Sequence, residues 1–146
     1  MREILYRGKR VDVVNAWAFG FYTKSPSGNT YITETVAGGA HPRIVQPDSV
    51  GQYTGAKDKN GKLIFEGDII HVDGIANDQL AEVCFGRYAT TGGPDTTHVG
   101  FFLEWKREVG LRKDFGYWAY SKRLSVIGNT YDNPELLFQE DDNEND

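Results

Sequence analysis

Residues Gln52 to Ile70 read QYTGAKDKNGKLIFEGDII and carry the strongest fold signals in the chain. Asn60-Gly61 lies between short β-favouring runs, and both residue types tolerate a positive φ at little cost, so we expect a tight type I′ turn there. Leu63-Ile64-Phe65 would form the return strand. Gly67-Asp68 then interrupts the pattern before the apolar run Ile69 to Val72, as at a corner where a small barrel bends its sheet. The segment therefore predicts short strands joined by tight turns.

Strand-like runs continue on both sides of this segment. Ala16–Thr23 and Thr30–Thr35 are rich in aromatic and β-branched residues, and turn formers at Lys24–Asn29 separate them, which predicts a hairpin. Glycines and two X-Pro pairs predict an irregular connection over Val36–Pro47. The other runs that we expect to be strands are Val50–Thr54, Ala81–Phe85, Val99–Trp105 and Tyr117–Ile127.

Two segments do not read as strands. Gly86–His98 is polar and contains glycine, so we expect a long loop there. Near the end of the chain, Asn133 is a residue type that caps helices and Pro134 suits the first helical position, which together predict a short C-terminal helix.

Length and charge predict one domain with a tail. The chain has 146 residues, enough for one hydrophobic core, and its 13% aromatic content favours strands. Residues 1–138 carry 16 cationic and 16 anionic side chains, so the net charge of −5 comes from the last eight residues. We therefore expect a single domain over residues 1–138 and a disordered acidic tail over residues 139–146. The nearly neutral body excludes an overall basic footprint for nucleic acid but leaves a local patch open.

Cys84 is the only cysteine, which excludes an intramolecular disulfide and a cysteine cluster for zinc or iron–sulfur ligation. We expect its thiol to be buried and inert, on the strand face opposite Val83 and Phe85. No apolar run approaches the roughly 18 residues of a membrane span. These features predict a cytoplasmic protein with no membrane partner.

Three spaced motifs together carry a family resemblance. They are Arg2-Glu3-Ile4-Leu5-Tyr6-Arg7-Gly8, the block from Gln52 to Ile70, and VIGNTYDNPELL at Val126–Leu137. With these motifs in this order over almost its whole length, the chain resembles the YopX family of phage and prophage proteins. Residues Gly86–Lys122 follow no family pattern that can be mapped.

The resemblance implies a mainly β protein: a small SH3-like barrel with additional hairpin strands, long loops and the short C-terminal helix. It also implies self-assembly into an oligomer and a phage or prophage origin in a bacterial host. It brings no established activity and no catalytic residue. The motif residues that we expect to have structural roles are Tyr53, Gly55, Asp58, Asn60, Gly61, Glu66, Gly67, Asp68, Gly128, Asn129, Asn133 and Pro134.

Two carboxylates and an imidazole are the nearest approach to a metal or acid–base cluster. Glu66, Asp68 and His71 lie within six residues, and Glu66 and Asp68 would share a strand face only if the strand ran straight through Gly67. In the structural interpretation, which we favour, Asp68 accepts backbone hydrogen bonds at the corner. We therefore predict no metal and no cofactor.

The segment Trp105 to Arg123 combines cations with aromatic rings and carries a local charge of +4. Aromatic faces beside cations suit single-stranded nucleic acid or a nucleotide, through stacking and charge. In the alternative interpretation, which we favour, the aromatic residues face the core or a subunit partner and the charges are solvated. The candidate ligand-binding residues are Trp105, Lys106, Arg107, Arg112, Lys113, Tyr117, Trp118, Tyr120, Lys122 and Arg123.

The sequence thus favours a non-enzymatic phage accessory protein that self-associates and binds a host protein, nucleic acid or a nucleotide. A metal-assisted hydrolase that uses Glu66, Asp68 and His71 is the alternative from another class. A virion or assembly component is the third hypothesis.

Overall fold

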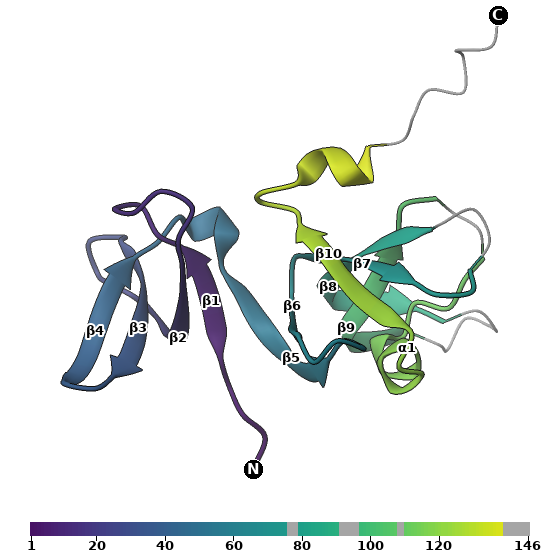
Figure 1. Ribbon diagram of the computed structural model, residues 1–146, viewed down its shortest axis with the longest axis horizontal. Helices are drawn as coiled ribbons and strands as arrows, with labels where there is room; N and C mark the ends of the chain where they lie inside the picture. The colour runs from purple at the N-terminus through teal and green to yellow at the C-terminus, as the bar shows by residue number, and fades with distance from the viewer. Residues whose placement is uncertain (76–78, 91–96, 108–109, 139–146) are drawn as a thin grey trace, which may run out of the picture. The chain divides into compact units, whose positions relative to one another are not determined.

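The computed structural model describes residues 1–75, 79–90, 97–107 and 110–138 (Figure 1). The chain forms two compact units. The first contains Met1–Ala56 and Leu63–Glu66, and the second contains Lys57–Lys62 and the chain from Gly67 onward. The expectation of a single domain over residues 1–138 stays a prediction, and the acidic tail lies outside the described residues.

The first unit is built on a six-stranded sheet with the order β4-β3-β2-β1-β5-β6. Antiparallel pairing joins β1 to both β2 and β5, and β3 to both β2 and β4. A 3₁₀ turn, η1 (Pro47–Ser49), precedes β5. The strands are β1 (Tyr6–Lys9), β2 (Trp17–Lys24), β3 (Thr30–Val36), β4 (Gly39–Ile44), β5 (Gly51–Lys57) and β6 (Leu63–Phe65).

The second unit contains a four-stranded antiparallel sheet with the order β10-β7-β8-β9. Its longest pairing joins β8 to β9, from Ala81 opposite Trp105 to Ala89 opposite Thr97. The helix α1 (Phe115–Tyr120) packs beside β9, and the 3₁₀ turn η3 (Pro134–Leu137) follows β10. The strands are β7 (Asp68–Val72), β8 (Leu80–Ala89), β9 (Thr97–Trp105) and β10 (Leu124–Asn129).

Each unit buries its own apolar side chains. In the first, Ala18, Ile32 and Val45 are buried together, with Tyr6 and Val50 packed against them. In the second, alternate residues such as Ala81 and Val83 share a face of a strand and are buried, and β7 is buried on both faces at Ile69 and Ile70. The most deeply buried apolar side chains of these strands are Ile69, Ile70, Val72, Ala81, Val83, Leu103 and Leu124.

The prediction of a mainly β protein is confirmed, and so is the hairpin of β2 and β3, whose residues pair from Phe21 opposite Thr33 to Lys24 opposite Thr30. The SH3-like barrel is not confirmed, since the strands of the described residues form two sheets, neither of which closes.

The irregular connection expected over Val36–Pro47 is wrong, because β4 forms there and pairs with β3. Gly38 and Gly39 take φ angles of 103° and 121° and make the tight turn between the two strands. Pro42 is tolerated because β4 is the edge of the sheet, where a missing N–H breaks no ladder.

Two other local predictions fail for reasons of packing. Tyr117–Ile127 was expected to be one strand, but its first part belongs to α1, because burial of Phe115 and Trp118 three residues apart favours a helical repeat. The long loop expected over Gly86–His98 is wrong at both ends, since β8 continues to Ala89 and β9 begins at Thr97. The rest of that loop, residues 91–96, lies outside the described residues. The short C-terminal helix is present as η3.

Candidate functional site

The motif residue Asp58 connects two distant parts of the chain within the second unit. Its Oδ1 accepts hydrogen bonds from the backbone N–H of Asn60 at 2.8 Å and of Lys62 at 2.9 Å, and its Oδ2 accepts one from Val126 at 2.9 Å. Burial alone would raise the pKa of this carboxyl, but the three backbone hydrogen bonds outweigh that effect and lower it. Asp58 therefore joins the turn of the central motif to the β10 motif.

The predicted type I′ turn is wrong because Asp58 imposes another geometry. The N–H of Asp58 donates to the carbonyl of Lys62 at 2.8 Å, and the N–H of Gly61 donates to the carbonyl of Asp58 at 3.0 Å. Gly61 takes a φ of 83°, while Asn60 does not take a positive φ. This is the pattern of a longer hairpin loop with glycine in the left-handed region.

The last motif is a compact hydrogen-bonded loop. The side chain of Asn129 accepts hydrogen bonds from the N–H groups of Tyr131 and Asp132 at 3.0 and 2.8 Å. Asn133 does not cap η3 with its side chain; its Oδ1 instead accepts from the N–H of Asn129 at 3.2 Å. A Cβ at Gly128 would lie 2.6 Å from that same oxygen, so a larger residue there would have to displace the Asn133 side chain. Pro134 begins η3.

The corner at Gly67 and Asp68 also links the motifs. Gly67 has a φ of 91°, its N–H donates to the carbonyl of Val83, and its carbonyl accepts from Thr130, both at 2.8 Å. Asp68 starts β7 and is 1% exposed. The geometry of Gly67 thus ties β8 to the loop of the last motif.

The remaining motif residues lie in the first unit. Tyr53 is buried, its ring lies 5.7 Å from that of Phe65, and its N–H donates to the carbonyl of Leu5 at 2.7 Å. Burial raises the pKa of its phenol. Gly55 takes a φ of 90° within β5, and Glu66, which follows β6, donates its N–H to the carbonyl of Gln52 at 2.9 Å.

The side chains considered for a metal site do not assemble into one. Within the described part of the chain, no three His, Cys, Asp or Glu residues form a group that could hold a metal ion. His71 instead faces Asp73, with 3.6 Å between Nδ1 and Oδ1. Glu66, Asp68 and His71, the residues of the hydrolase alternative, form no such group in this part of the chain. Cys84 is only half-buried, and its thiol lies 3.4 Å from a carboxylate oxygen of Glu82.

The two tryptophans of the segment 105–123 hold a loop in place. Trp105 and Trp118 are 7% and 4% exposed, and their rings meet edge to face at 5.4 Å. Both indole N–H groups donate to the backbone carbonyl of Arg112, at 2.9 and 2.8 Å. The carbonyl of Lys113 accepts from the N–H of Leu103 at 2.7 Å. Residues 110–114 are thus fastened along β9, and most of each indole is buried.

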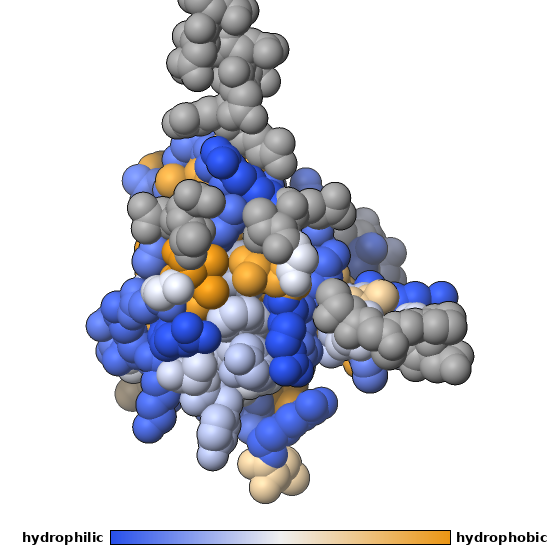
Figure 2. All heavy atoms as spheres, turned by 90° about the vertical axis from the view of Figure 1, so that its right-hand side faces the viewer, coloured by the Kyte–Doolittle hydropathy of each residue, from blue (hydrophilic) through white to orange (hydrophobic). Residues whose placement is uncertain are grey.

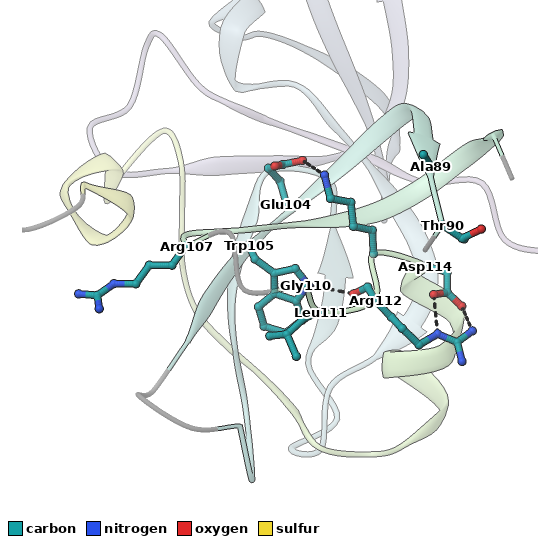
Figure 3. Close-up of a pocket in the computed structure, with 10 residues that line it drawn as sticks. Ala89, Thr90, Glu104, Trp105, Arg107, Gly110, Leu111, Arg112 and Asp114 are labelled. Carbon is teal, nitrogen blue, oxygen red and sulfur yellow. Dashed lines mark hydrogen bonds and ion pairs between the residues drawn. The ribbon is translucent and has the colours of Figure 1, made fainter. Parts of the chain in front are cut away.

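A pocket of about 330 Å³ opens at this loop (Figure 3). Figure 3 shows the Trp105 and Leu111 side chains next to each other, with the Arg112–Asp114 pair to one side, while Arg107 points away from the other labelled side chains. The volume falls in the range of small-molecule sites, which combine an apolar lining with a few polar groups. The residues that line the pocket are Ala89, Thr90, Glu104, Trp105, Arg107, Gly110, Leu111, Arg112, Lys113 and Asp114.

The ion pairs set the electrostatics of the pocket. Arg112 donates two hydrogen bonds to the carboxylate of Asp114, at 3.0 and 2.7 Å, and Lys113 lies 3.3 Å from a carboxylate oxygen of Glu104. The Arg112 guanidinium holds the pKa of Asp114 below its ordinary value. Asp114 is therefore ionised and paired at neutral pH, which suits positioning more than proton transfer.

The tyrosines of α1 behave differently from the tryptophans. Tyr117 is 46% exposed and Tyr120 is 91% exposed. The guanidinium carbon of Arg112 lies 4.1 Å from the centre of the Tyr117 ring. Two further cations of the segment follow α1 in the chain. Lys122 is exposed, and the guanidinium carbon of Arg123 lies 5.2 Å from the centre of the Trp118 ring. Lys106, half-buried, follows β9 and donates its N–H to the carbonyl of Leu80 at 2.8 Å.

Of the ten candidate ligand-binding residues, the structure brings four into the pocket: Trp105, Arg107, Arg112 and Lys113. Sequence reasoning missed the acidic partners Glu104 and Asp114, and also Leu111. The sequence places the acid Asp114 next to the cations Arg112 and Lys113, and a second acid, Glu104, on the preceding predicted strand. These opposite charges could have been used to predict the ion pairs. Figure 2 shows one face of the molecule, where apolar and weakly polar side chains lie inside a hydrophilic border, as binding faces often do.

The central motif is joined by hydrogen bonds to each of the other two, from Tyr53 to Leu5 and from Val126 to Asp58. A family model of the YopX protein matches residues 6–138. The chain belongs to the YopX family. The crystal structure of protein EF1440 from Enterococcus faecalis is similar to this YopX-family chain, with 23% sequence identity and a TM-score of 0.53. The match covers 94% of this chain and 100% of that one, and at this identity it shows the fold alone. No curated protein matches the sequence.

The pairing of β1 with β5 explains why the first two YopX motifs occur together, since Tyr6 lies opposite Gln52 and Arg7 opposite Gly51. Arg7 is buried, and its guanidinium lies 4.9 Å from the ring centres of both Trp17 and Phe65. Among the described helices, none is long and apolar enough to cross a bilayer.

Proposed function

We propose that this YopX-family chain is a non-enzymatic, self-associating binding module of a phage or prophage, active in the cytoplasm of the bacterial host. The observation that carries the proposal is the pocket at Trp105 and Leu111 with its paired charges, beside the exposed tyrosines of α1. Its partner is a host protein, nucleic acid or a nucleotide.

The chemistry of this surface supports binding. Guanidinium, ammonium and aromatic groups border the pocket, and these groups recognise anions and planar rings without changing protonation. The two carboxylates, Glu104 and Asp114, are held in ion pairs with Lys113 and Arg112. A hydrolase would instead need a carboxylate or imidazole that is poised to exchange a proton.

Exposed aromatic side chains in the first unit support self-association. Phe19 and Phe21 lie two residues apart on β2 and therefore share a face, and they are 45% and 59% exposed. The Phe19 ring lies 5.6 Å from that of Phe65, which is buried, so Phe19 is packed on the core below it. Clustered apolar exposure of this kind marks interaction surfaces.

Native mass spectrometry of the full chain, purified gently from a bacterial lysate, tests both parts. We expect a defined oligomer that retains extra mass from a partner. Phe21→Ser should shift the oligomer toward the monomer, whereas Thr23→Ser, on the same face of the same strand, should not. A monomer at every concentration that also retains nothing would refute the proposed function.

A further inference from the structure

The two tyrosines of α1 expose much of their rings, although the edge of one contacts Trp118 at 5.0 Å between ring centres. Tyr117 and Tyr120 are three residues apart and lie on the same side of the helix, whereas Phe115 and Trp118 are 5% and 4% exposed. One side of α1 thus packs on the core of the second unit. The two tyrosine rings are exposed on another side. A single exposed aromatic needs no explanation, but two on one helical turn form a surface.

Cations border these two rings. Arg112 lies over Tyr117 at 4.1 Å, and its side chain is 54% exposed although it is paired with Asp114. The bidentate pair fixes the plane of the guanidinium, so its position above the ring is preorganised. Lys122, exposed, follows the helix with a φ of 58°. We call Tyr117, Tyr120, Arg112 and Lys122 the tyrosine face.

The local charge is opposite in sign to that of the whole protein. Residues 105–123 carry +4 in a chain whose net charge is −5. A positive segment that also presents exposed aromatic rings matches a polyanion with flat, unpaired groups. Single strands of nucleic acid have both properties, whereas the bases of a duplex are stacked on one another and are not available to a protein ring.

We propose that single-stranded nucleic acid docks on the tyrosine face, with neighbouring bases stacked on Tyr117 and Tyr120 and the backbone phosphates near Arg112 and Lys122. This inference rests on the proposed binding function and names its partner. Trp105 and Trp118 support the face from beneath, through their bonds to the Arg112 carbonyl. Base identity contributes little, because every base has a face that can stack.

Fluorescence anisotropy with labelled oligonucleotides tests the proposal on the full chain. The probes are oligothymidylate and oligouridylate of about 15 nucleotides, near the upper site size of small single-strand-binding folds, and a mixed-sequence duplex of the same length. Both single strands should bind more tightly than the duplex, and binding should weaken as salt rises. Tighter binding of oligothymidylate would indicate DNA as the natural ligand, and tighter binding of oligouridylate would indicate RNA.

Matched variants locate the binding surface. Tyr117→Ala and Tyr120→Ala should each weaken binding about tenfold, while Tyr117→Phe and Tyr120→Phe keep the ring and should retain it. Lys122→Asn suits the left-handed backbone and should lower the slope of log affinity against log salt by about one. Tyr22→Ala removes an exposed tyrosine of the first unit and should change nothing. Circular dichroism confirms that each variant folds.

Three results would overturn the inference. They are no binding of either single strand at about 100 µM protein and low salt, duplex bound as tightly as single strands, and unchanged affinity in folded Tyr117→Ala/Tyr120→Ala protein. If a host protein is retained in native mass spectra while the oligonucleotides fail, this inference is wrong and the proposed binding function stands.

Discussion

Replacing Asp58 should destabilise the second unit more than replacing any exposed acid. The carboxylate is 7% exposed and accepts three backbone hydrogen bonds, two from its own turn and one from Val126 on β10. Asp58→Ala removes all three acceptors at once. Asp58→Asn keeps the shape but turns an amide N–H₂ toward at least one backbone N–H, so a donor then faces a donor.

The expected loss follows from the surroundings of each donor. The N–H groups of Asn60 and Lys62 belong to exposed residues and can bind water in the variant, so each contributes about 0.5–1 kcal/mol. The N–H of Val126 lies in a half-buried strand, and leaving it without an acceptor costs about 1–2 kcal/mol. We expect about 3 kcal/mol for Asp58→Ala and about half of that for Asp58→Asn.

Urea unfolding monitored by tryptophan fluorescence measures this loss. The first unit contains Trp17 and the second contains Trp105 and Trp118, so a Trp17→Phe background restricts the signal to the second unit. A loss of about 3 kcal/mol corresponds to a fall of roughly 6–12 °C in Tm for a chain of this size. Glu135→Ala removes an exposed acid of the same unit and serves as the control, for which we expect no measurable shift.

The reasoning would be refuted if Asp58→Ala unfolded at the same urea concentration as the parent in the Trp17→Phe background. Equal stability of Asp58→Asn and the parent would refute the specific role of the carboxylate charge. In both cases the three hydrogen bonds would not contribute to the stability of the folded second unit.

Three further predictions concern acid, a close backbone contact and the indole bonds. The folded pKa of Asp58 lies below the ordinary 3.8, so its contribution to stability is present above that value and is lost as pH falls through the folded pKa; Asp58→Asn should therefore flatten the decline in urea midpoint below about pH 4. Gly20→Ala should unfold the first unit, as judged by the near-UV signal of Trp17, because its Cβ would lie 1.9 Å from the Thr33 carbonyl oxygen; an intact signal would contradict this geometry. Trp118→Phe deletes one hydrogen bond to Arg112 and some packing, so we expect a loss of about 1–2 kcal/mol in urea unfolding, and a stability equal to the parent would argue against that role.

Much of the secondary structure could be predicted from local patterns. The runs that became β2, β3, β6 and β7 were visible because aromatic and β-branched residues alternate with turn formers. The prediction failed where one element depends on another. The strand β4 exists because β3 offers it a pairing edge, and α1 exists because Phe115 and Trp118 can be buried together.

The candidate site was predictable only in part. The aromatic and basic composition of residues 105–123 drew attention to the correct segment, but composition cannot say which ring is buried. Trp105 and Trp118 are buried because each indole N–H reaches the same Arg112 carbonyl, a contact that needs β9, α1 and the loop between them in place.

The sequence alone determined the YopX family, the mainly β class, the β2–β3 hairpin and the neutral body with an acidic end, because these depend on local residue patterns and charge counts. Tertiary structure alone decided that Asp58 bridges to Val126, that Arg112 pairs with Asp114 over Tyr117, and that a pocket opens beside Trp105. These features join residues from separate elements, and their hydrogen bonds and ion pairs form only after the strands have brought the groups within about 3 Å of one another.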